Sequence, residues 1–268
     1  MRLETIFTDS SPRIAADCLG VGPLVLFLHG IGGNRSNWRD QLPAFAERYL
    51  AVAWDARGYG LSDGYDGALN FADFSADLER LLGQLKVEKA HLVGLSMGGR
   101  IAADFYFRSP NRVASLTLVD THSGFAALSP AQRKEYVDSR LAPLKTDKTV
   151  ADIAPVVAGK LLGPNASADM RARLEASITS LRQDYYMKSV SATVEQDSVG
   201  DFSTIQVPTH VMVGEHDRLT TPAMCRELAD QIKGAAYSIV SSAGHLSNIE
   251  NPTAFNASAL GFIDSISA

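Results

Sequence analysis

Short apolar runs recur along most of the chain, separated by longer segments in which apolar and polar positions alternate with a helical period. Unbroken apolar runs of this length are typical of strands buried on both faces of a parallel sheet. The predicted strands are 24–28, 50–54, 91–93, 116–119, 210–213 and 236–240. The predicted helices are 38–48, 70–85, 100–107, 222–232 and 252–263. This alternation predicts an α/β fold with helices on both faces of the sheet.

Two segments depart from the alternation. Residues 2–8 and 13–19 flank Ser10-Ser11-Pro12 and are predicted to form an antiparallel hairpin at the sheet edge, which brings the mostly parallel sheet to eight strands. Residues 123–199 contain no convincing strand; their patterns predict helices at 129–141, 149–162, 166–182 and 184–198.

A helical insertion between two strands of such a sheet usually covers the edge where ligands bind. We therefore expect a core domain made of residues 1–122 and 200–268, and a helical cap, or lid, made of residues 123–199. The alternative is a run of connecting helices, but the segment is too long for one crossover.

Composition narrows the class of protein. The 268 residues are 46% hydrophobic and 21% charged, which fits a globular chain and argues against disorder. The net charge of −5 and the lack of a basic block make nucleic acid a poor partner. Cys18 and Cys225 form neither a disulfide framework nor a metal-binding cluster, and they suit a reducing cytoplasm. We expect no signal peptide and no membrane helix. The sequence does not fix the oligomeric state, which is either a monomer or a homodimer.

The segment Gly94-Leu95-Ser96-Met97-Gly98 follows a predicted strand and precedes a predicted helix. A serine at such a turn, with a glycine two residues away on each side, is typical of a nucleophile elbow. The turn strains the serine backbone and exposes the hydroxyl, and glycine allows the flanking residues to approach closely. The adjacent helix N-terminus favours negative charge. We therefore predict Ser96 as a catalytic nucleophile.

A serine hydroxyl needs a neighbouring base, and the base needs an orienting acid. In this fold class the acid and the histidine follow the serine in that order. Asp217 follows the strand 210–213 and His245 follows the last strand, so both are expected at the same sheet edge as Ser96. Asp120, which ends the strand 116–119, is an alternative candidate for the acid.

The loop His29-Gly30-Ile31-Gly32-Gly33 directly follows the first buried strand. Its glycines would let the backbone approach a ligand closely. We predict an oxyanion hole made by the N–H groups of Ile31 and Met97, each typically worth roughly 3 kcal/mol of transition-state stabilisation. The loop lacks the spacing of dinucleotide and phosphate loops. No metal or cofactor is expected.

Candidate substrate-binding residues surround this loop. They are His29, Gly30, Arg35, Trp38 and Leu246. An arginine at Arg35 would suit a substrate that carries a carboxylate; alternatively Arg35 is a surface residue and Trp38 packs in the core. His29 could instead brace its loop by hydrogen bonds. Within the predicted cap, Arg140, Tyr185, Tyr186 and Met187 are further candidates that the sequence cannot rank.

Taken together, these segments resemble the α/β-hydrolase-fold serine hydrolases. The matching segments are His29–Gly32, Asp55–Ser62, Gly94–Gly98, Gly214–Asp217 and Gly244–His245. The resemblance implies a cofactor-free esterase, lactonase, thioesterase or C–C bond hydrolase. Gly94–Gly99 and His245–Glu250 are locally similar to 3-oxoadipate enol-lactone hydrolases. Those enzymes tend to lack a histidine at the position of His29, and their tryptophan-containing lid signature is missing from this chain.

The expected activity is hydrolysis of a small carboxylic ester or lactone through an acyl-enzyme on Ser96, with Asp217 and His245 as its partners. One alternative is a C–C hydrolase of a vinylogous diketone. Such enzymes usually carry a tryptophan after the catalytic histidine, where this chain has Leu246. A second alternative is a ligand receptor on the same fold with slow or no turnover.

Overall fold

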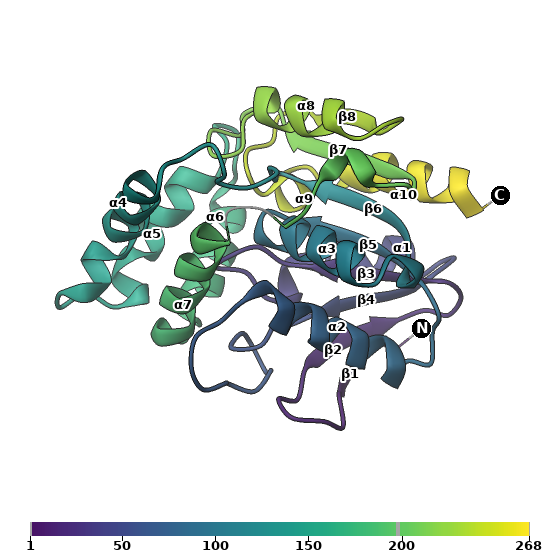
Figure 1. Ribbon diagram of the computed structural model, residues 1–268, viewed down its shortest axis with the longest axis horizontal. Helices are drawn as coiled ribbons and strands as arrows, with labels where there is room; N and C mark the ends of the chain where they lie inside the picture. Colours follow the sequence, from purple (N-terminus) through teal and green to yellow (C-terminus); the bar gives the residue numbers. More distant parts are fainter. Residues whose placement is uncertain (1, 197–198, 268) are drawn as a thin grey trace.

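The computed structural model describes residues 2–196 and 199–267. Its centre is one sheet of eight strands in the order β1-β2-β4-β3-β5-β6-β7-β8 (Figure 1). The strands are β1 Glu4–Phe7, β2 Ala15–Leu19, β3 Leu24–Leu28, β4 Leu50–Trp54, β5 Ala90–Leu95, β6 Val113–Val119, β7 Thr209–Gly214 and β8 Ala236–Val240. The predicted eight-stranded α/β fold is confirmed.

Among the described strands, β2 is the one that runs opposite to all the others. It pairs antiparallel with both β1 and β4, whereas the pairs from β4 through β8 are parallel. The predicted N-terminal hairpin is therefore present at the sheet edge. Every residue of β3, β5 and β7 is buried, as expected for central strands covered on both faces.

Helices cover both faces of the sheet. α2 (Phe71–Gln84), α3 (Met97–Arg108) and α8 (Pro222–Gln231) lie on one face, and α1 (Leu42–Phe45) and α10 (Pro252–Ser267) lie on the other (Figure 1). The short helix α9 (Ser247–Glu250) precedes α10. Four 3₁₀ turns complete the described helical elements, at Arg35–Trp38, Pro110–Arg112, Ala142–Lys145 and Phe202–Thr204.

The predicted helix 38–48 is wrong as a continuous element. The structure instead has the 3₁₀ turn Arg35–Trp38 followed by the single helical turn of α1. Pro43 is the reason: without an N–H it cannot donate back along a helix, so it fits best in a first turn, which is where it stands in α1. The helix must restart beside it. The other predicted core helices match within a few residues.

Four helices stand between β6 and β7: α4 (Pro130–Leu141), α5 (Val150–Leu161), α6 (Ala168–Thr179) and α7 (Gln183–Glu195). They correspond to the four helices predicted in this segment. The last was predicted to extend to residue 198, but α7 ends at Glu195, and residues 197–198 lie outside the described residues.

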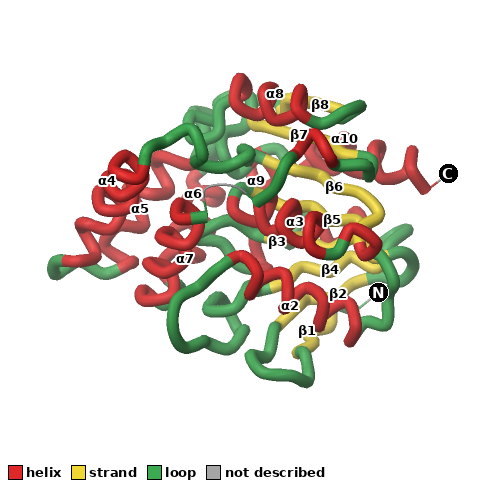
Figure 2. Tube along the Cα trace, in the orientation of Figure 1, coloured by secondary structure: helices red, strands yellow, loops and turns green. Residues whose placement is uncertain are grey.

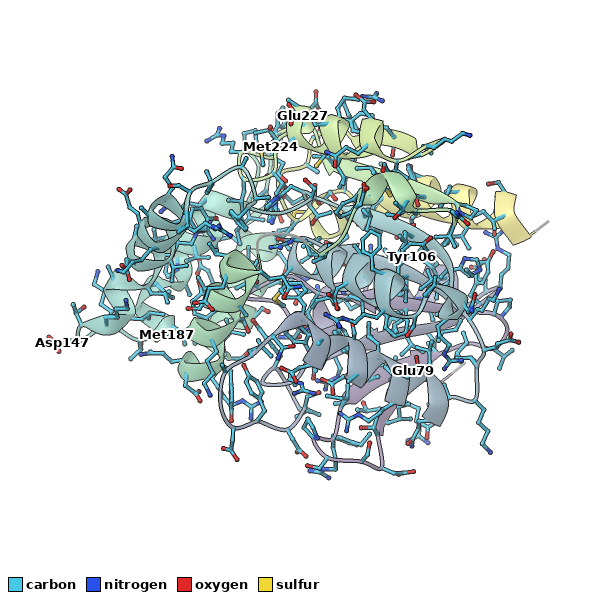
Figure 3. All side chains as sticks on the ribbon, in the orientation of Figure 1. Glu79, Tyr106, Asp147, Met187, Met224 and Glu227 are labelled. Carbon is cyan, nitrogen blue, oxygen red and sulfur yellow. The ribbon has the colours of Figure 1, made fainter. Side chains whose placement is uncertain are left out.

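These four helices gather at one end of the sheet, and loops join them to it (Figure 2). Asp147, between α4 and α5, lies at the tip farthest from the sheet (Figure 3). Residues from α4 and α7 line a cavity with Ser96, which follows β5. The four helices therefore cover the edge at which the parallel strands end.

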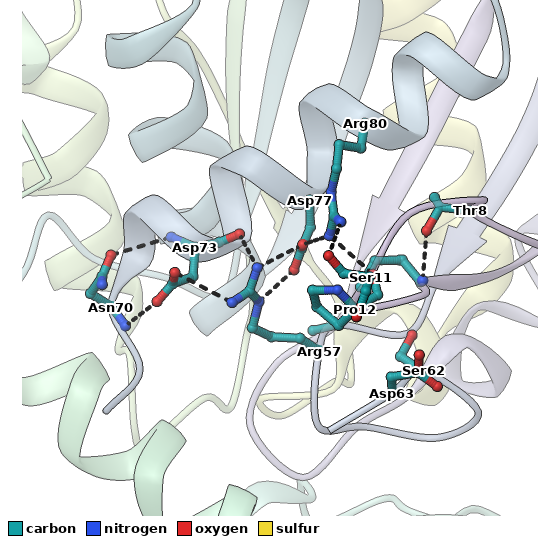
Figure 4. Close-up of polar contacts among 12 residues, drawn as sticks. Thr8, Ser11, Pro12, Arg57, Ser62, Asp63, Asn70, Asp73, Asp77 and Arg80 are labelled. Carbon is teal, nitrogen blue, oxygen red and sulfur yellow. Dashed lines mark hydrogen bonds and ion pairs between the residues drawn. The ribbon is translucent and has the colours of Figure 1, made fainter. Parts of the chain in front are cut away.

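The segment Asp55–Gly58, one of the motifs of the resemblance, is held by ion pairs (Figure 4). Arg57 pairs with Asp77 of α2 at 2.7 Å and with Asp73 at 3.3 Å. Arg80 also pairs with Asp77 and donates to the carbonyl oxygens of Ser11 and Pro12. Arg57 thus fixes the turn after β4 onto α2, which is a structural role.

Candidate active site

Ser96 lies at the turn between β5 and α3, with φ 55° and ψ −115°. A positive φ is strained for a residue with a Cβ, and such strain gathers at functional sites. The turn is possible because its flanks are glycine: a Cβ on Gly94 would lie 2.2 Å from the carbonyl oxygen of Gly98, and one on Gly98 would lie 2.1 Å from that of Leu28. The sequence prediction of a crowded elbow fits this geometry.

Hydrogen bonds hold the Ser96 backbone on both sides. Its N–H donates to the carbonyl oxygen of Val119 at 2.8 Å. Its carbonyl oxygen accepts from the Thr121 hydroxyl at 2.8 Å and from the Gly99 N–H at 3.0 Å. Ser96 nevertheless remains partly exposed. These bonds over-determine the strained turn and leave the side chain free to face the cavity.

His245 and Asp217 come together from the loops that follow β8 and β7. Nδ1 of His245 lies 2.8 Å from Oδ2 of Asp217, and both residues are 3% exposed. Asp217 also accepts from the Thr220 hydroxyl at 2.6 Å and from the N–H groups of Leu219 and Thr220. With Nδ1 as the donor to the carboxylate, Nε2 of His245 is available as a base.

The pair stabilises its own charges. Burial alone would lower the pKa of His245, but the hydrogen bond to Asp217 and the charges of Asp217 and Asp120 outweigh it and raise that pKa above its usual value. Burial opposes ionisation of Asp217, yet the hydrogen bond and charge of His245 hold the pKa of Asp217 below its usual range. An ionised Asp217 can stabilise an imidazolium, as proton transfer requires.

Asp120, the alternative acid, has a different partner. Its Oδ2 accepts from the hydroxyl and N–H of Ser247, and its Oδ1 accepts from the Gly214 N–H at 2.7 Å. Burial and the charge of Asp217 raise its pKa. Asp120 therefore ties the ends of β6 and β7 to the segment after His245, while Asp217 makes the contact with the imidazole.

Two cavities meet at Ser96. The first, which we call the narrow cavity, has a volume of about 20 Å³, room for about one water molecule. Its lining includes the loop His29–Gly33, Trp38, Ser96, His245 and Leu246. The second, the wide cavity, has a volume of about 310 Å³ and lies under α4 and α7. Ser96 and Ile31 line both cavities, so a reacting carbonyl at Ser96 would have access to each.

The structure brings four of the five candidate substrate-binding residues to the narrow cavity: His29, Gly30, Trp38 and Leu246. The role of His29 there is restricted. Its Nε2 accepts from the Ala56 N–H at 3.1 Å and its Nδ1 lies 2.9 Å from the Gly30 carbonyl oxygen. Burial lowers its pKa. His29 is therefore a neutral brace for its loop.

Arg35, the fifth candidate, does not reach either cavity. Its guanidinium pairs with the carboxylates of Asp17, at 3.0 Å, and of Asp55. The backbone N–H of Arg35 also donates to Asp55. Asp17 lies in β2, and Asp55 directly follows β4. Arg35 is thus used in holding the loop, and its charge is already matched.

The predicted oxyanion donors are Ile31 and Met97. Within the part of the chain that the structure describes, neither N–H donates a hydrogen bond. Ile31 lines both cavities, and Met97 is the first residue of α3, directly after Ser96. Both donors are therefore available to a ligand beside Ser96.

Glu250 is a residue of this site that the sequence did not reveal. Its carboxylate accepts from the N–H groups of Gly244 and Leu246, on either side of His245, and from the Gly163 N–H just after α5. The His245 N–H donates to the Leu161 carbonyl oxygen at 2.8 Å. The histidine loop is thus bound directly to the helical segment. The position of Glu250, six residues after Gly244, gave no signal of this.

Across residues 2–196 and 199–267, no group of three or more His, Cys, Asp or Glu side chains has a metal-binding arrangement. In the same residues, no helix combines the length and apolar character needed to cross a bilayer.

Comparison with known proteins agrees with this geometry. The profile of the alpha/beta hydrolase fold family matches residues 23–252, so the chain belongs to that family. It is similar to 3-oxoadipate enol-lactonase 2 of Acinetobacter baylyi, with 26% identity over 237 residues, covering 87% of this chain and 86% of that protein. It is also similar to a 2-hydroxy-6-oxononadienedioate/2-hydroxy-6-oxononatrienedioate hydrolase of Cupriavidus pinatubonensis, at 27% identity, covering 95% and 92%.

Among solved structures, a hydrolase from Pseudomonas aeruginosa PA01 superposes with a TM-score of 0.85 at 28% identity, and the match covers 98% of each chain. The family resemblance inferred from the motifs is confirmed, and the three similar proteins named above are hydrolases.

Proposed function

We propose that this protein is a serine hydrolase that cleaves a carboxylic ester or lactone of a small molecule through an acyl-enzyme on Ser96. One observation carries the proposal: a strained, partly exposed serine lines the same cavity as a histidine whose Nδ1 is bonded to a buried carboxylate. The name of the enol-lactonase relative supports the substrate type.

In this mechanism Nε2 of His245 takes the proton of the Ser96 hydroxyl as its oxygen attacks the substrate carbonyl. The developing oxyanion accepts hydrogen bonds from the N–H groups of Ile31 and Met97. Asp217 fixes the imidazole tautomer and stabilises the imidazolium, which then protonates the leaving alcohol. His245 finally activates a water molecule, which releases the acid and regenerates the serine.

The helical segment 123–199 acts in this proposal as a cap domain on a core made of residues 1–122 and 200–268. Support comes from the wide cavity, whose walls include α4 and α7 on one side and Ser96 on the other. The cap would exclude bulk water from the acyl-enzyme and select the substrate.

A second candidate is C–C bond hydrolysis of a vinylogous diketone, which the name of the Cupriavidus relative favours. The same three residues would serve that reaction. A panel of aryl esters, lactones and one such diketone, measured on a single preparation, separates the two by their kcat/KM values. Binding without turnover across the panel would favour a receptor.

A fluorophosphonate probe tests the nucleophile directly. We expect one covalent adduct per chain, located at Ser96 by peptide mass spectrometry, and no adduct in Ser96→Ala. Ser247→Ala is the matched control, because Ser247 lies near the site but its hydroxyl is bonded to Asp120. Full activity in Ser96→Ala would overturn the proposal.

A further inference from the structure

The wide cavity has an unusual composition. Its walls are mostly apolar, with Phe125, Leu128, Val190 and Met224 among them. Met224 projects from the first turn of α8 toward the four inserted helices (Figure 3). Among the described residues that line this cavity, Arg140 is the one cationic side chain, and none is an aspartate or a glutamate.

Arg140 reaches the cavity from the last turn of α4. Its guanidinium lies 4.5 Å from the ring centroid of Tyr136, one turn earlier on the same helix. Its charge also acts on His245, since it is among the influences that lower the pKa of that imidazole. The guanidinium is thus held beside Tyr136, and it lines the same cavity as Ser96.

Arg140 has no carboxylate partner. Throughout residues 2–196 and 199–267, no aspartate or glutamate oxygen lies within ion-pairing distance of it. Two arginines of the same segment have partners: Arg173 pairs with Asp40 at 2.9 Å, and Arg182 donates to the carbonyl oxygens of Gly58 and Ser62. A half-buried cation among apolar walls is costly unless a ligand anion pairs with it.

The neighbouring histidine does not change this charge balance. His122 lines the cavity too, but burial and the charge of Arg100 lower its pKa to about 4. It is neutral near pH 7, and its Nδ1 is engaged with the backbone of Gly124. The cavity therefore presents a single positive group to an incoming molecule.

We propose that Arg140 binds a carboxylate of the substrate, so that the substrate class is an ester or lactone carrying an acid group at the end of an apolar chain. The inference rests on the proposed function of Ser96. The guanidinium fork matches a carboxylate by two parallel hydrogen bonds, which an ammonium cannot reproduce. The apolar walls would take the chain between the acid and the scissile carbonyl.

Mono-4-nitrophenyl esters of straight-chain dicarboxylic acids, from pentanedioic to nonanedioic acid, test this proposal against their isosteric terminal amides. The leaving group is constant, so only the charge differs within each pair. We expect the wild-type protein to prefer the acid in kcat/KM at the chain length that spans the cavity. Arg140→Met should lose about 10- to 100-fold on that acid while keeping its rate on the amide within a few-fold.

Arg140→Lys should retain part of the preference, because the charge stays while the fork is lost. Arg171→Met, at an exposed position of α6 that lines neither cavity, should match the wild type. An equal loss on acid and amide in Arg140→Met, or no acid preference in the wild type at any chain length, would overturn the proposal.

Two readouts separate this outcome from failure of the proposed function. Fluorophosphonate labelling of Ser96 in Arg140→Met reports whether the nucleophile is intact. Calorimetric binding of the free dicarboxylic acids needs no turnover: we expect binding to the wild type that weakens about 10-fold or more in Arg140→Met. Labelling without acid binding would overturn the anion site alone.

Discussion

The core and the helical segment 123–199 differ in how tightly their residues are held. Strands β5 and β7 of the core are buried throughout, and Ser96 and Asp217 follow them, while His245 follows the edge strand β8. In α4, which the structure describes throughout, Leu141 is the one buried residue. Precise geometry comes from the core, whereas α4, which supplies Tyr136 and Arg140 to the wall of the wide cavity, has little buried surface. We infer that chemistry depends on the first region and substrate choice on the second.

Substitution at Ser96, the proposed nucleophile, should produce the largest effect and should act on every substrate. Ser96→Gly removes the hydroxyl, so we expect kcat to fall by about 10⁴- to 10⁶-fold. Glycine tolerates the positive φ that strains the serine, so the free energy of unfolding should rise by about 1 kcal/mol. Steady-state kinetics and urea denaturation measure the two effects. Ser96→Ala, which keeps the strain, should lose activity without the gain in stability.

The contact between the two regions can be broken at Gly163. A Cβ there would lie 2.8 Å from the N–H nitrogen of Gly244, so the histidine loop must shift. We expect Gly163→Ala to lower kcat by about 10- to 100-fold, because small displacements of catalytic groups are costly.

Gly159→Ala is the matched control for that experiment. Gly159 lies within α5, where an added Cβ would meet nothing closer than Arg171 at 3.6 Å. Alanine should keep kcat unchanged and raise the stability by about 0.5–1 kcal/mol. Equal kcat values for the two variants would show that the histidine loop does not depend on this contact.

The loss of folding stability at acid pH should depend more on buried core residues than on residues of exposed loops. His210 in β7 is buried, and burial lowers its pKa to about 4. Its folded pKa lies below the unfolded value of about 6.5, so the unfolded chain binds more protons and stability falls as the pH drops from about 6.5 toward 4. His210→Asn should reduce that fall by about 1–2 kcal/mol in urea midpoints measured across this range.

His216→Asn, at a partly exposed loop position, is the control for a histidine-to-asparagine change outside the core. A steeper loss of stability toward acid in His210→Asn would contradict the conclusion that burial lowers the pKa of His210.

The smallest expected effect is a shift of the activity profile. The proposed mechanism requires a neutral His245, so kcat/KM should rise with pH through the pKa of that residue, which Asp217 and Asp120 raise above its usual value. The charge of Asp120 contributes to the elevation, so Asp120→Asn should move the acid limb to lower pH by less than about one unit. An acid limb that stays fixed would place Asp120 outside the electrostatics of the site.

The sequence was sufficient to place residues whose positions depend on local order. Ser96, Asp217 and His245 each follow a predictable strand, and parallel strands end at one edge, so their proximity follows from the fold class. Arg35 shows the limit. It is close in sequence to the loop His29–Gly33, but its partners are Asp17 in β2 and Asp55 just after β4, and only the folded sheet brings them together.

The same limit applies to Arg140 and Glu250, whose neighbours in the folded chain could not be identified from the sequence. Arg140 could be placed on a helix, but whether it faces a cavity depends on how α4 packs over the sheet. Glu250 joins Gly244 and Gly163, which are distant from each other in sequence. The continuous helix predicted over 38–48 failed for a local reason, Pro43, whose effect the apolar spacing masked.

The point at which the helical segment leaves and rejoins the sheet has a consequence for how such a chain can change. The segment departs after β6 and returns before β7, and these strands are direct neighbours with Leu118 beside Val211. The Asp120 N–H even donates to the Met212 carbonyl oxygen at 2.9 Å. Because these strands are parallel, the segment leaves from the carboxyl end of β6, and the chain must cross the length of the sheet to enter β7 at its amino end. A different set of helices could be inserted between the two strands without altering the register of the sheet, as long as it still spans that crossing.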